Sequence, residues 1–272
     1  MNNLNLNRDN SGENKALYLT IANGLATITL NRAEQGNALN LEMVTLLAEA
    51  TDEILNNSSV KVILITGTGN NFCVGGDIRA FIAEREQLPA FVASLLEPLN
   101  YALAKLEAAK LPIVSALNGA VGGAGIGLAL IADYVLAAES MKLRCGYTAI
   151  GLSPDAGSSW LLANRVGTFR AKQLFLSNTP LTANECLNLA IVDQVYPDAE
   201  LMSQVQALLR ELESGPRKAM ARVKHLLDHK MTQRSFKEQL ELERRFIMES
   251  ASESDVQEGI LAFTQKRKPS FS

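Results

Sequence analysis

One acidic side chain, Asp155, stands in the stretch IGLSPDAGSSW, residues 150–160, among small and apolar neighbours. Apolar surroundings raise the pKa of a carboxylate, which suits it to exchange protons with carbon. Aspartate is also frequent at the N-cap of helices, and the residues that follow Asp155 favour a helix. Asp155 is therefore either the acid or base of a reaction or the cap of a helix.

Two glycine-rich stretches each follow a short apolar run. They are GTGNNFCVGGDI, after residues 61–67, and NGAVGGAGIGLALIAD, after residues 112–117. Glycines between a buried strand and a helix let a ligand approach the backbone N–H groups at the start of the helix. Two such turns, if they meet, can direct two N–H donors at one oxygen atom. For either turn alone, tight turns and close helix packing are the favoured explanation, so the prediction depends on the pair.

The sequence lacks the motifs of several other kinds of functional site. The chain has no G-x-x-x-x-G-K-[ST] phosphate loop and no G-x-S-x-G nucleophile elbow, and GAGIG lacks the spacing of a dinucleotide loop. His225 and His229 are the only histidines, and their HLLDH context lacks the glutamate of the H-E-x-x-H zinc motif. A solvated helix face is the favoured interpretation, and we expect no metal.

Composition restricts the class of protein. The 272 residues are 47% hydrophobic with a formal net charge of −3, and the sequence pI is about 5.6. This charge offers no basic surface for nucleic acid, and no apolar run reaches the length of a membrane span. Cys73, Cys145 and Cys186 form no C-x-x-C pair, which fits a reducing compartment. We expect a cytoplasmic protein without nucleic-acid or membrane partners.

The elements that must position the candidate groups alternate between strand and helix. LYLTIANGLATITLN contains two alternating runs joined by Asn23 and Gly24, which predicts a β-hairpin. Apolar runs at 61–67, 112–119 and 134–140 are typical of strands covered on both faces. NLEMVTLLAEATDEILNN repeats its apolar residues at helical spacing. After a flexible polar tail over 1–14, we predict an α/β core with mainly parallel strands over 15–195.

Residues 196–272 show helical patterns without strands, for example in AELMSQVQALLRELES and QRSFKEQLELERRFIMES. Several of these helices carry apolar residues on more than one face, among them Leu240, Phe246, Ile247 and Phe263. A surface helix that packs on one side only does not need them. We therefore expect a C-terminal helical region that packs against another subunit.

Five stretches together resemble the crotonase, or enoyl-CoA hydratase/isomerase, superfamily: ITLNRAEQGNALN, FCVGGDI, LPIVSALNGAVGGAGIGLALIADYVLAA, IGLSPDAGSSWLL and EGILAFTQKRKPSF. The resemblance runs nearly end to end. It implies a crotonase-like spiral of β-β-α turns followed by C-terminal helices that build a homotrimer or a dimer of trimers. It also implies an acyl-CoA thioester substrate whose enolate is stabilised, with coenzyme A as part of the substrate and no permanently bound cofactor.

The resemblance assigns roles to individual residues. The backbone N–H groups of Gly76 and Ala124 match the two oxyanion-hole donors, which agrees with the paired glycine-rich turns. Phe263 and Lys266 match residues that reach the coenzyme A of a neighbouring subunit, and Asp77 has a helix cap as its alternative role. We expect the substrate to contact Gly76, Asp77, Ile78, Arg79, Ala124, Tyr147, Phe263 and Lys266.

Asp155 matches the base of enoyl-CoA isomerases and of the ring-enoyl-CoA isomerase of phenylacetate breakdown, and also the nucleophile of a dehalogenase relative. The two glutamates of the family's hydratases would fall at Gly127 and Tyr147, and neither is acidic. Tyr147 would then shape the acyl pocket, orient Asp155 or simply pack. One carboxylate suffices for an isomerase, because it can take a proton from one carbon and return it to another.

We therefore predict an enoyl-CoA isomerase in which Asp155, Gly76 and Ala124 are the catalytic groups. Ring-enoyl isomerisation is a close variant of this prediction. Hydration of a 2-enoyl-CoA by a rearranged site, as in fatty-acid β-oxidation or related acyl-CoA degradation, is one alternative. A non-catalytic CoA-binding or RNA-associated scaffold is the other, although the net charge of −3 disfavours RNA.

Overall fold

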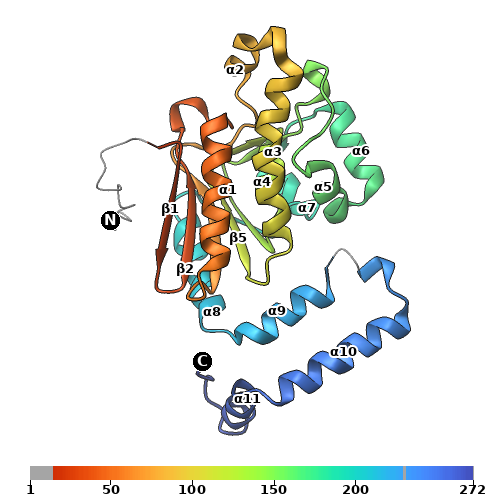
Figure 1. Ribbon diagram of the computed structural model, residues 1–272. Helices are drawn as coiled ribbons and strands as arrows, with labels where there is room; N and C mark the ends of the chain where they lie inside the picture. Colours follow the sequence, from red (N-terminus) through yellow and green to blue (C-terminus); the bar gives the residue numbers. More distant parts are fainter. Residues whose placement is uncertain (1–14, 229–230, 272) are drawn as a thin grey trace.

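Two sheets form the centre of the computed structural model, which describes residues 15–228 and 231–271 (Figure 1). The predicted tail over 1–14 lies outside the described residues. The larger sheet has the order β1 (Leu17–Ala22), β2 (Leu25–Leu30), β3 (Val62–Gly67), β5 (Ile113–Leu117), β7 (Tyr134–Ala138) and β10 (Gln194–Tyr196). The smaller sheet has the order β4 (Asn71–Cys73), β6 (Ala120–Gly122), β8 (Lys142–Arg144) and β9 (Leu181–Thr182).

The strand pairings follow the sequence-based prediction. β1 and β2 are antiparallel, and their turn has φ of 52° at Asn23 and 88° at Gly24. Both values lie in the left-handed region, which the Asn-Gly pair tolerates, so the predicted hairpin is confirmed. From β2 through β3, β5 and β7 to β10, every neighbouring pair in the larger sheet is parallel.

Successive turns of the chain build a spiral. Each turn adds a strand to the larger sheet, then a strand to the smaller sheet, and then a helix. The first such turn is β3, β4 and the helices α2 (Ile78–Ala83) and α3 (Leu88–Glu107), and the second is β5, β6 and α4 (Gly125–Leu130). The third is β7, β8 and α5 (Ser158–Val166), before α6 (Thr168–Ser177) and α7 (Ala183–Asn188). The predicted spiral of β-β-α turns is therefore confirmed.

The larger sheet is covered on both faces, which explains its continuous apolar strands. Ile63 and Ile65 of β3 belong to the core that includes buried residues of α1 (Leu41–Asn56) and α3. Val62 and Leu64 point to the opposite face, where they meet the buried side chains of α8 (Leu201–Glu213). The helical region predicted from residue 196 onward thus begins with a helix that packs on the sheet.

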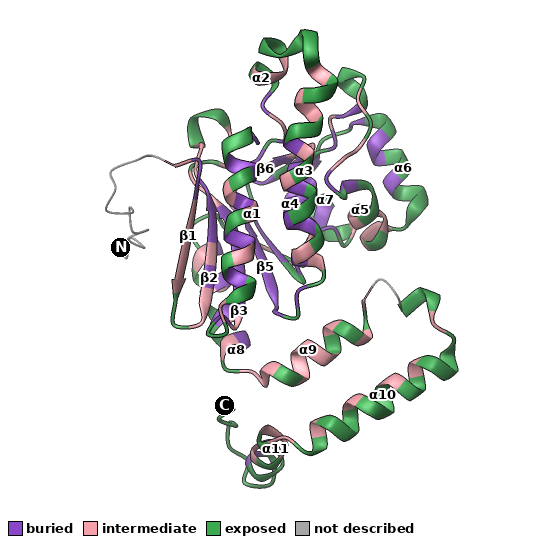
Figure 2. Cartoon of the chain, viewed as in Figure 1, coloured by how far each residue is buried: buried purple, intermediate pink, exposed green. Residues whose placement is uncertain are grey.

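The remaining C-terminal helices are α9 (Arg217–Leu226), α10 (Phe236–Ala251) and α11 (Ser254–Thr264). They extend away from the two sheets (Figure 1), and α10 and α11 are mostly exposed (Figure 2). The exposed apolar side chains of α10 and α11 are Phe236, Leu240, Ile247, Met248, Ile260, Leu261 and Phe263. Short 3-10 helices lie at η1 (Ala33–Gln35), η2 (Arg85–Gln87), η3 (Thr148–Ile150) and η4 (Met231–Gln233). No helix in the described ranges is long and apolar enough to cross a membrane.

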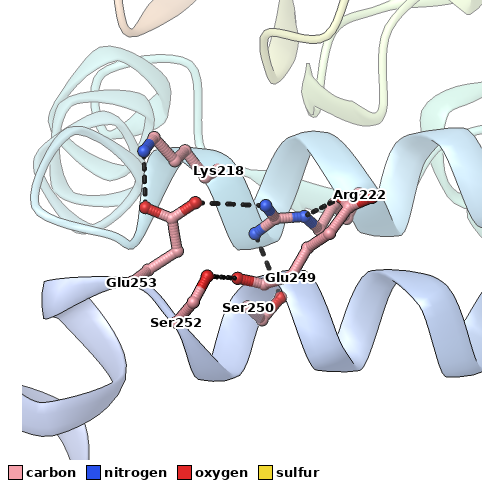
Figure 3. Close-up of polar contacts among 6 residues, drawn as sticks. All are labelled: Lys218, Arg222, Glu249, Ser250, Ser252 and Glu253. Carbon is pink, nitrogen blue, oxygen red and sulfur yellow. Dashed lines mark hydrogen bonds and ion pairs between the residues drawn. The ribbon is translucent and has the colours of Figure 1, made fainter.

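Ion pairs join α9 to the end of α10 and the start of α11 (Figure 3). Arg222 lies 3.2 Å from Glu253 and 3.5 Å from Glu249, and it donates a hydrogen bond to Ser250. Lys218 binds the other carboxylate oxygen of Glu253 at 2.5 Å. These polar contacts hold the helices together where few apolar side chains are buried within the chain.

Candidate active site

The two glycine-rich turns lie side by side. Gly75 follows β4 and Gly123 follows β6, and these two strands pair in parallel in the smaller sheet. A β-carbon added to Gly75 would lie 3.0 Å from the carbonyl oxygen of Gly122 and 3.3 Å from the Cα of Gly123. The φ angles are 105° at Gly75 and 48° at Gly123. Glycine is needed here because the backbones approach closely in a left-handed conformation.

The predicted donor of each turn has no backbone acceptor in the part of the chain that the structure describes. The N–H of Leu39 donates to the carbonyl of Gly75 at 2.8 Å, and the N–H of Asp77 donates to the carbonyl of Leu39 at 3.0 Å. In such a parallel bridge the residue between them, Gly76, directs its own N–H away from Leu39. Among the described residues, neither Gly76 nor Ala124 donates its N–H to a backbone carbonyl in these turns. The two predicted donors therefore belong to adjacent turns.

Asp155 lies in the segment between η3 and α5, and it does not cap α5. The N-cap of α5 is Gly157, and no side chain accepts a cap hydrogen bond there. The cap interpretation of Asp155 is therefore wrong. Its main-chain carbonyl instead accepts hydrogen bonds from the N–H and the hydroxyl of Ser158, at 2.9 Å and 2.7 Å. Ala156 follows with a φ of 49°, so the carboxylate stands on a tight, locally held turn.

Tyr147 holds the carboxylate of Asp155. Its phenol donates a hydrogen bond of 2.6 Å to Oδ1 of Asp155 and lies 3.1 Å from the hydroxyl of Ser158. The Tyr147 ring is buried and packs against Phe175, with 6.1 Å between ring centroids. Of the roles considered for Tyr147, orientation of Asp155 is the one that this contact supports.

The two acidic groups have raised pKa values for related reasons. Partial burial raises the pKa of Asp155, and the hydrogen bond from Tyr147 only partly opposes this effect. Burial, together with the negative charge of Asp155, raises the pKa of the Tyr147 phenol. Tyr147 therefore remains a protonated donor while Asp155 becomes a stronger base than an exposed aspartate.

Gly127 has no room for a side chain. A β-carbon at this position would lie 2.0 Å from the carbonyl oxygen of Ala156, the residue directly after Asp155. The turn that carries Asp155 thus occupies the space beside α4 where the resemblance puts one hydratase glutamate. Tyr147 fills the position of the other glutamate with a phenol.

The other predicted contacts divide into two groups. Ile78 and Arg79 are exposed at the start of α2, while Asp77 is buried and caps this helix by accepting the N–H of Arg79 at 3.1 Å. The cap alternative for Asp77 is therefore confirmed. Phe263 lies in the last turn of α11, and Lys266 follows two residues after the helix ends. This helix is far from α2 (Figure 1), so the single chain does not bring these residues to Gly76.

Sequence reasoning missed Ser158 and Arg32. Ser158 binds both Tyr147 and Asp155, and Arg32 forms an ion pair of 2.8 Å with Asp77. Arg32 does belong to ITLNRAEQGNALN, but no letter in that stretch indicates its partner. Within the described ranges, no group of three or more His, Cys, Asp or Glu side chains could hold a metal ion. His229 lies outside those ranges.

The fold and this site define an acyl-CoA enzyme of the crotonase type. A family model described as enoyl-CoA hydratase/isomerase matches residues 20–272, and the chain belongs to this family. A protein of Rhodobacter capsulatus named "Probable enoyl-CoA hydratase" is 37% identical, over 92% of this chain and 95% of that protein. The 1,2-epoxyphenylacetyl-CoA isomerase of Escherichia coli is 34% identical, over 92% of this chain and 96% of that protein. The crystal structure of an enoyl-CoA hydratase from Polaromonas sp. JS666 superimposes with a TM-score of 0.87 at 30% identity, and the match covers 94% of this chain and 99% of that chain.

Proposed function

We propose that the protein moves the double bond of an enoyl-CoA thioester from the 3- to the 2-position, with Asp155 as the only acid and base. The observation that carries the proposal is the 2.6 Å hydrogen bond by which the Tyr147 phenol holds one oxygen of this half-buried carboxylate. A carboxylate that is oriented, partly desolvated and raised in pKa is suited to remove a proton from carbon.

The reaction needs one proton and no water. Asp155 takes a proton from C2 of the 3-enoyl thioester, and the electron pair moves into the thioester carbonyl to form a dienolate. The N–H groups of Gly76 and Ala124 hold the resulting oxyanion, and each such donor contributes roughly 3–4 kcal/mol. The protonated Asp155 then returns the proton to C4 as the electron pair forms the C2–C3 double bond.

Tyr147 determines which oxygen of Asp155 carries the travelling proton. Oδ1 already accepts the phenol hydrogen, so the substrate proton binds to Oδ2. Because the pKa of the phenol is raised, Tyr147 keeps its own proton throughout the cycle. Tyr147 is thus a positioning residue in this mechanism.

Hydration has weaker support from the site. Adding water by the family's two-glutamate mechanism needs a second carboxylate, and Gly127 has no space for one beside Ala156. The relatives carry both hydratase and isomerase names, so the choice depends on the chemistry of the site. The name of the Escherichia coli relative, which acts on an epoxide of phenylacetyl-CoA, supports a ring-containing acyl group as a variant substrate.

We also propose a homotrimer or a dimer of trimers in the cytoplasm. The exposed apolar side chains of α10 and α11 support an oligomer, and Phe263 and Lys266 would then reach the coenzyme A bound by a neighbouring subunit. The free, buried thiols of Cys73, Cys145 and Cys186 support a reducing compartment.

The test is to incubate the protein separately with a 3-enoyl-CoA and a 2-enoyl-CoA and to analyse the products by chromatography and mass spectrometry. We expect conversion of the 3-enoyl-CoA into its 2-isomer, without a change of mass. Hydration of the 2-enoyl-CoA without isomerisation would overturn the proposal. Binding of both thioesters without any product would favour the non-catalytic scaffold.

A further inference from the structure

The side chain of Arg32 connects Ala38 with Asp77, the residue that follows Gly76. Its Nη1 donates to the carbonyl of Ala38 at 2.5 Å, and its Nη2 donates to Oδ2 of Asp77 at 2.8 Å. The two side chains are only 18% and 12% exposed, so this pair is shielded from solvent far more than a surface ion pair.

The backbone of Leu39 makes the matching connection. Leu39 follows Ala38 and binds the carbonyl of Gly75 and the N–H of Asp77. Arg32 and Leu39 together hold the residues before and after Gly76, while the N–H of Gly76 itself makes no bond in the bridge. We propose that the Arg32–Asp77 ion pair is a clamp that positions the Gly76 N–H toward the thioester oxygen.

Arg32 is itself anchored, which the clamp requires. Its backbone N–H donates to the side-chain oxygen of Asn37 at 2.8 Å. The amide nitrogen of Asn37 donates to the carbonyls of Thr68 and Asn71, at 2.9 Å and 2.8 Å. Asn37 is fully buried and has a φ of 56°. The clamp is thereby tied to the connection between β3 and β4 and to the start of β4, the strand that precedes the turn of Gly76.

The charges of the pair agree with a positioning role. Burial alone would raise the pKa of Asp77, but the hydrogen bond and charge of Arg32 outweigh this effect, and the pKa is lowered. Asp77 therefore stays ionised and paired. Both of its carboxylate oxygens have protein partners, Arg32 and the N–H of Arg79. Asp77 acts on the substrate through Gly76 rather than by direct contact with coenzyme A.

The inference rests on the proposed function, in which the Gly76 N–H holds the thioester oxygen, so its test needs a readout besides turnover. Dimethylaminocinnamoyl-CoA is a conjugated thioester whose absorption moves to longer wavelength when its carbonyl is polarised. Binding of this probe to wild-type protein should therefore produce a red shift. Asp77→Asn removes the charge but keeps an acceptor for Arg79, and Arg32→Lys keeps the charge but loses the planar fork that reaches two acceptors.

We expect both variants to reduce the red shift of the probe. With 3-enoyl-CoA, their kcat should fall about 10- to 100-fold while KM changes less than about three-fold, because a displaced donor weakens transition-state binding. Arg165→Gln is the matched control. Arg165 is also 18% exposed and also joins an aspartate, Asp193, to a backbone carbonyl, that of Ala132. This control should lower the melting temperature similarly but keep the red shift and kcat.

The outcomes separate the clamp from the proposed function. Absence of a red shift in the wild type would refute the oxyanion hole, and a red shift without isomerisation would refute only the role of Asp155. A wild-type red shift that both variants retain in full would overturn the clamp. A weaker affinity for the probe with an unchanged red shift would also overturn it, because Asp77 would then bind coenzyme A. Loss of folding in both variants would overturn it as well, because the pair would then be a requirement of the fold.

Discussion

Replacement of Gly127 by alanine tests the geometry around Asp155 with a single methyl group. The new β-carbon would lie 2.0 Å from the carbonyl oxygen of Ala156. Unstrained contacts between carbon and a carbonyl oxygen begin at about 3.3 Å, so the turn must recede by roughly 1 Å. A displacement of this size at a reacting group costs about 100-fold in rate, and overpacking costs about 1–3 kcal/mol of stability.

The assay is isomerisation of a 3-enoyl-CoA, measured together with the melting temperature. Gly167→Ala is the control, because Gly167 has a φ of 78° and a β-carbon there would meet nothing within 4 Å. Because its ψ is 155°, this conformation is essentially restricted to glycine, and the substitution should cost roughly 1–3 kcal/mol of stability through backbone strain alone, without loss of kcat.

Gly127→Glu should also lose isomerisation and should not gain hydration, since a glutamate needs still more room beside Ala156. An unchanged kcat in Gly127→Ala would refute the idea that a side chain at position 127 displaces the turn that carries Asp155. Efficient hydration by Gly127→Glu would refute it equally.

Two further variants and a mass measurement test the proposals. Asp155→Asn should abolish nearly all isomerisation while thioester binding persists, and turnover at the wild-type rate would remove Asp155 from the mechanism. The pKa of Asp155 is higher in the folded protein than in the unfolded chain, so ionisation of Asp155 lowers the stability as the pH rises above its unfolded pKa. At pH 7 the melting temperature of Asp155→Asn should therefore equal or exceed that of the wild type. Tyr147→Phe removes a hydrogen bond to a charged group, which is worth about 1.5–3 kcal/mol, so kcat should fall roughly 10- to 100-fold with little change in KM. The same change raises the pKa of Asp155, so the acid limb of the kcat profile should move to higher pH; an unmoved limb would mean that Tyr147 only packs. Light scattering at micromolar concentration should give the mass of a trimer or hexamer, whereas a monomeric mass would contradict the proposed assembly.

Local patterns in the sequence were sufficient for the longer strands and helices of the fold. Asn23 and Gly24 specify their hairpin because both tolerate positive φ at adjacent positions. The helix α1 follows from its apolar period and from Asn40, whose side chain accepts the N–H of Met43. The predicted strands at 61–67, 112–119 and 134–140 correspond to β3, β5 and β7, with ends that differ by up to two residues. These features depend on neighbours in the chain, which a sequence displays directly.

Local patterns do not predict the contact between the two glycine-rich turns. The sequence indicates that each turn follows a strand and permits a close approach of backbones. Their contact comes from the parallel pairing of β4 and β6, which are three residues each and too short to show a period. The prediction that Gly76 and Ala124 are the paired donors came from the family resemblance, because periodicity does not indicate it.

The surroundings of Asp155 were decided by tertiary structure. The sequence places an aspartate before a helix, and that pattern fits a cap as well as a base. The left-handed turn at Ala156 and Gly157 separates Asp155 from α5, and the chain between β8 and α5 returns Tyr147 to its carboxylate. Arg32 and Asp77 likewise meet across 45 positions of sequence because β2 and β3 pair in parallel. A side chain's partner and its desolvation depend on which distant segments enclose it, and no local pattern contains that information.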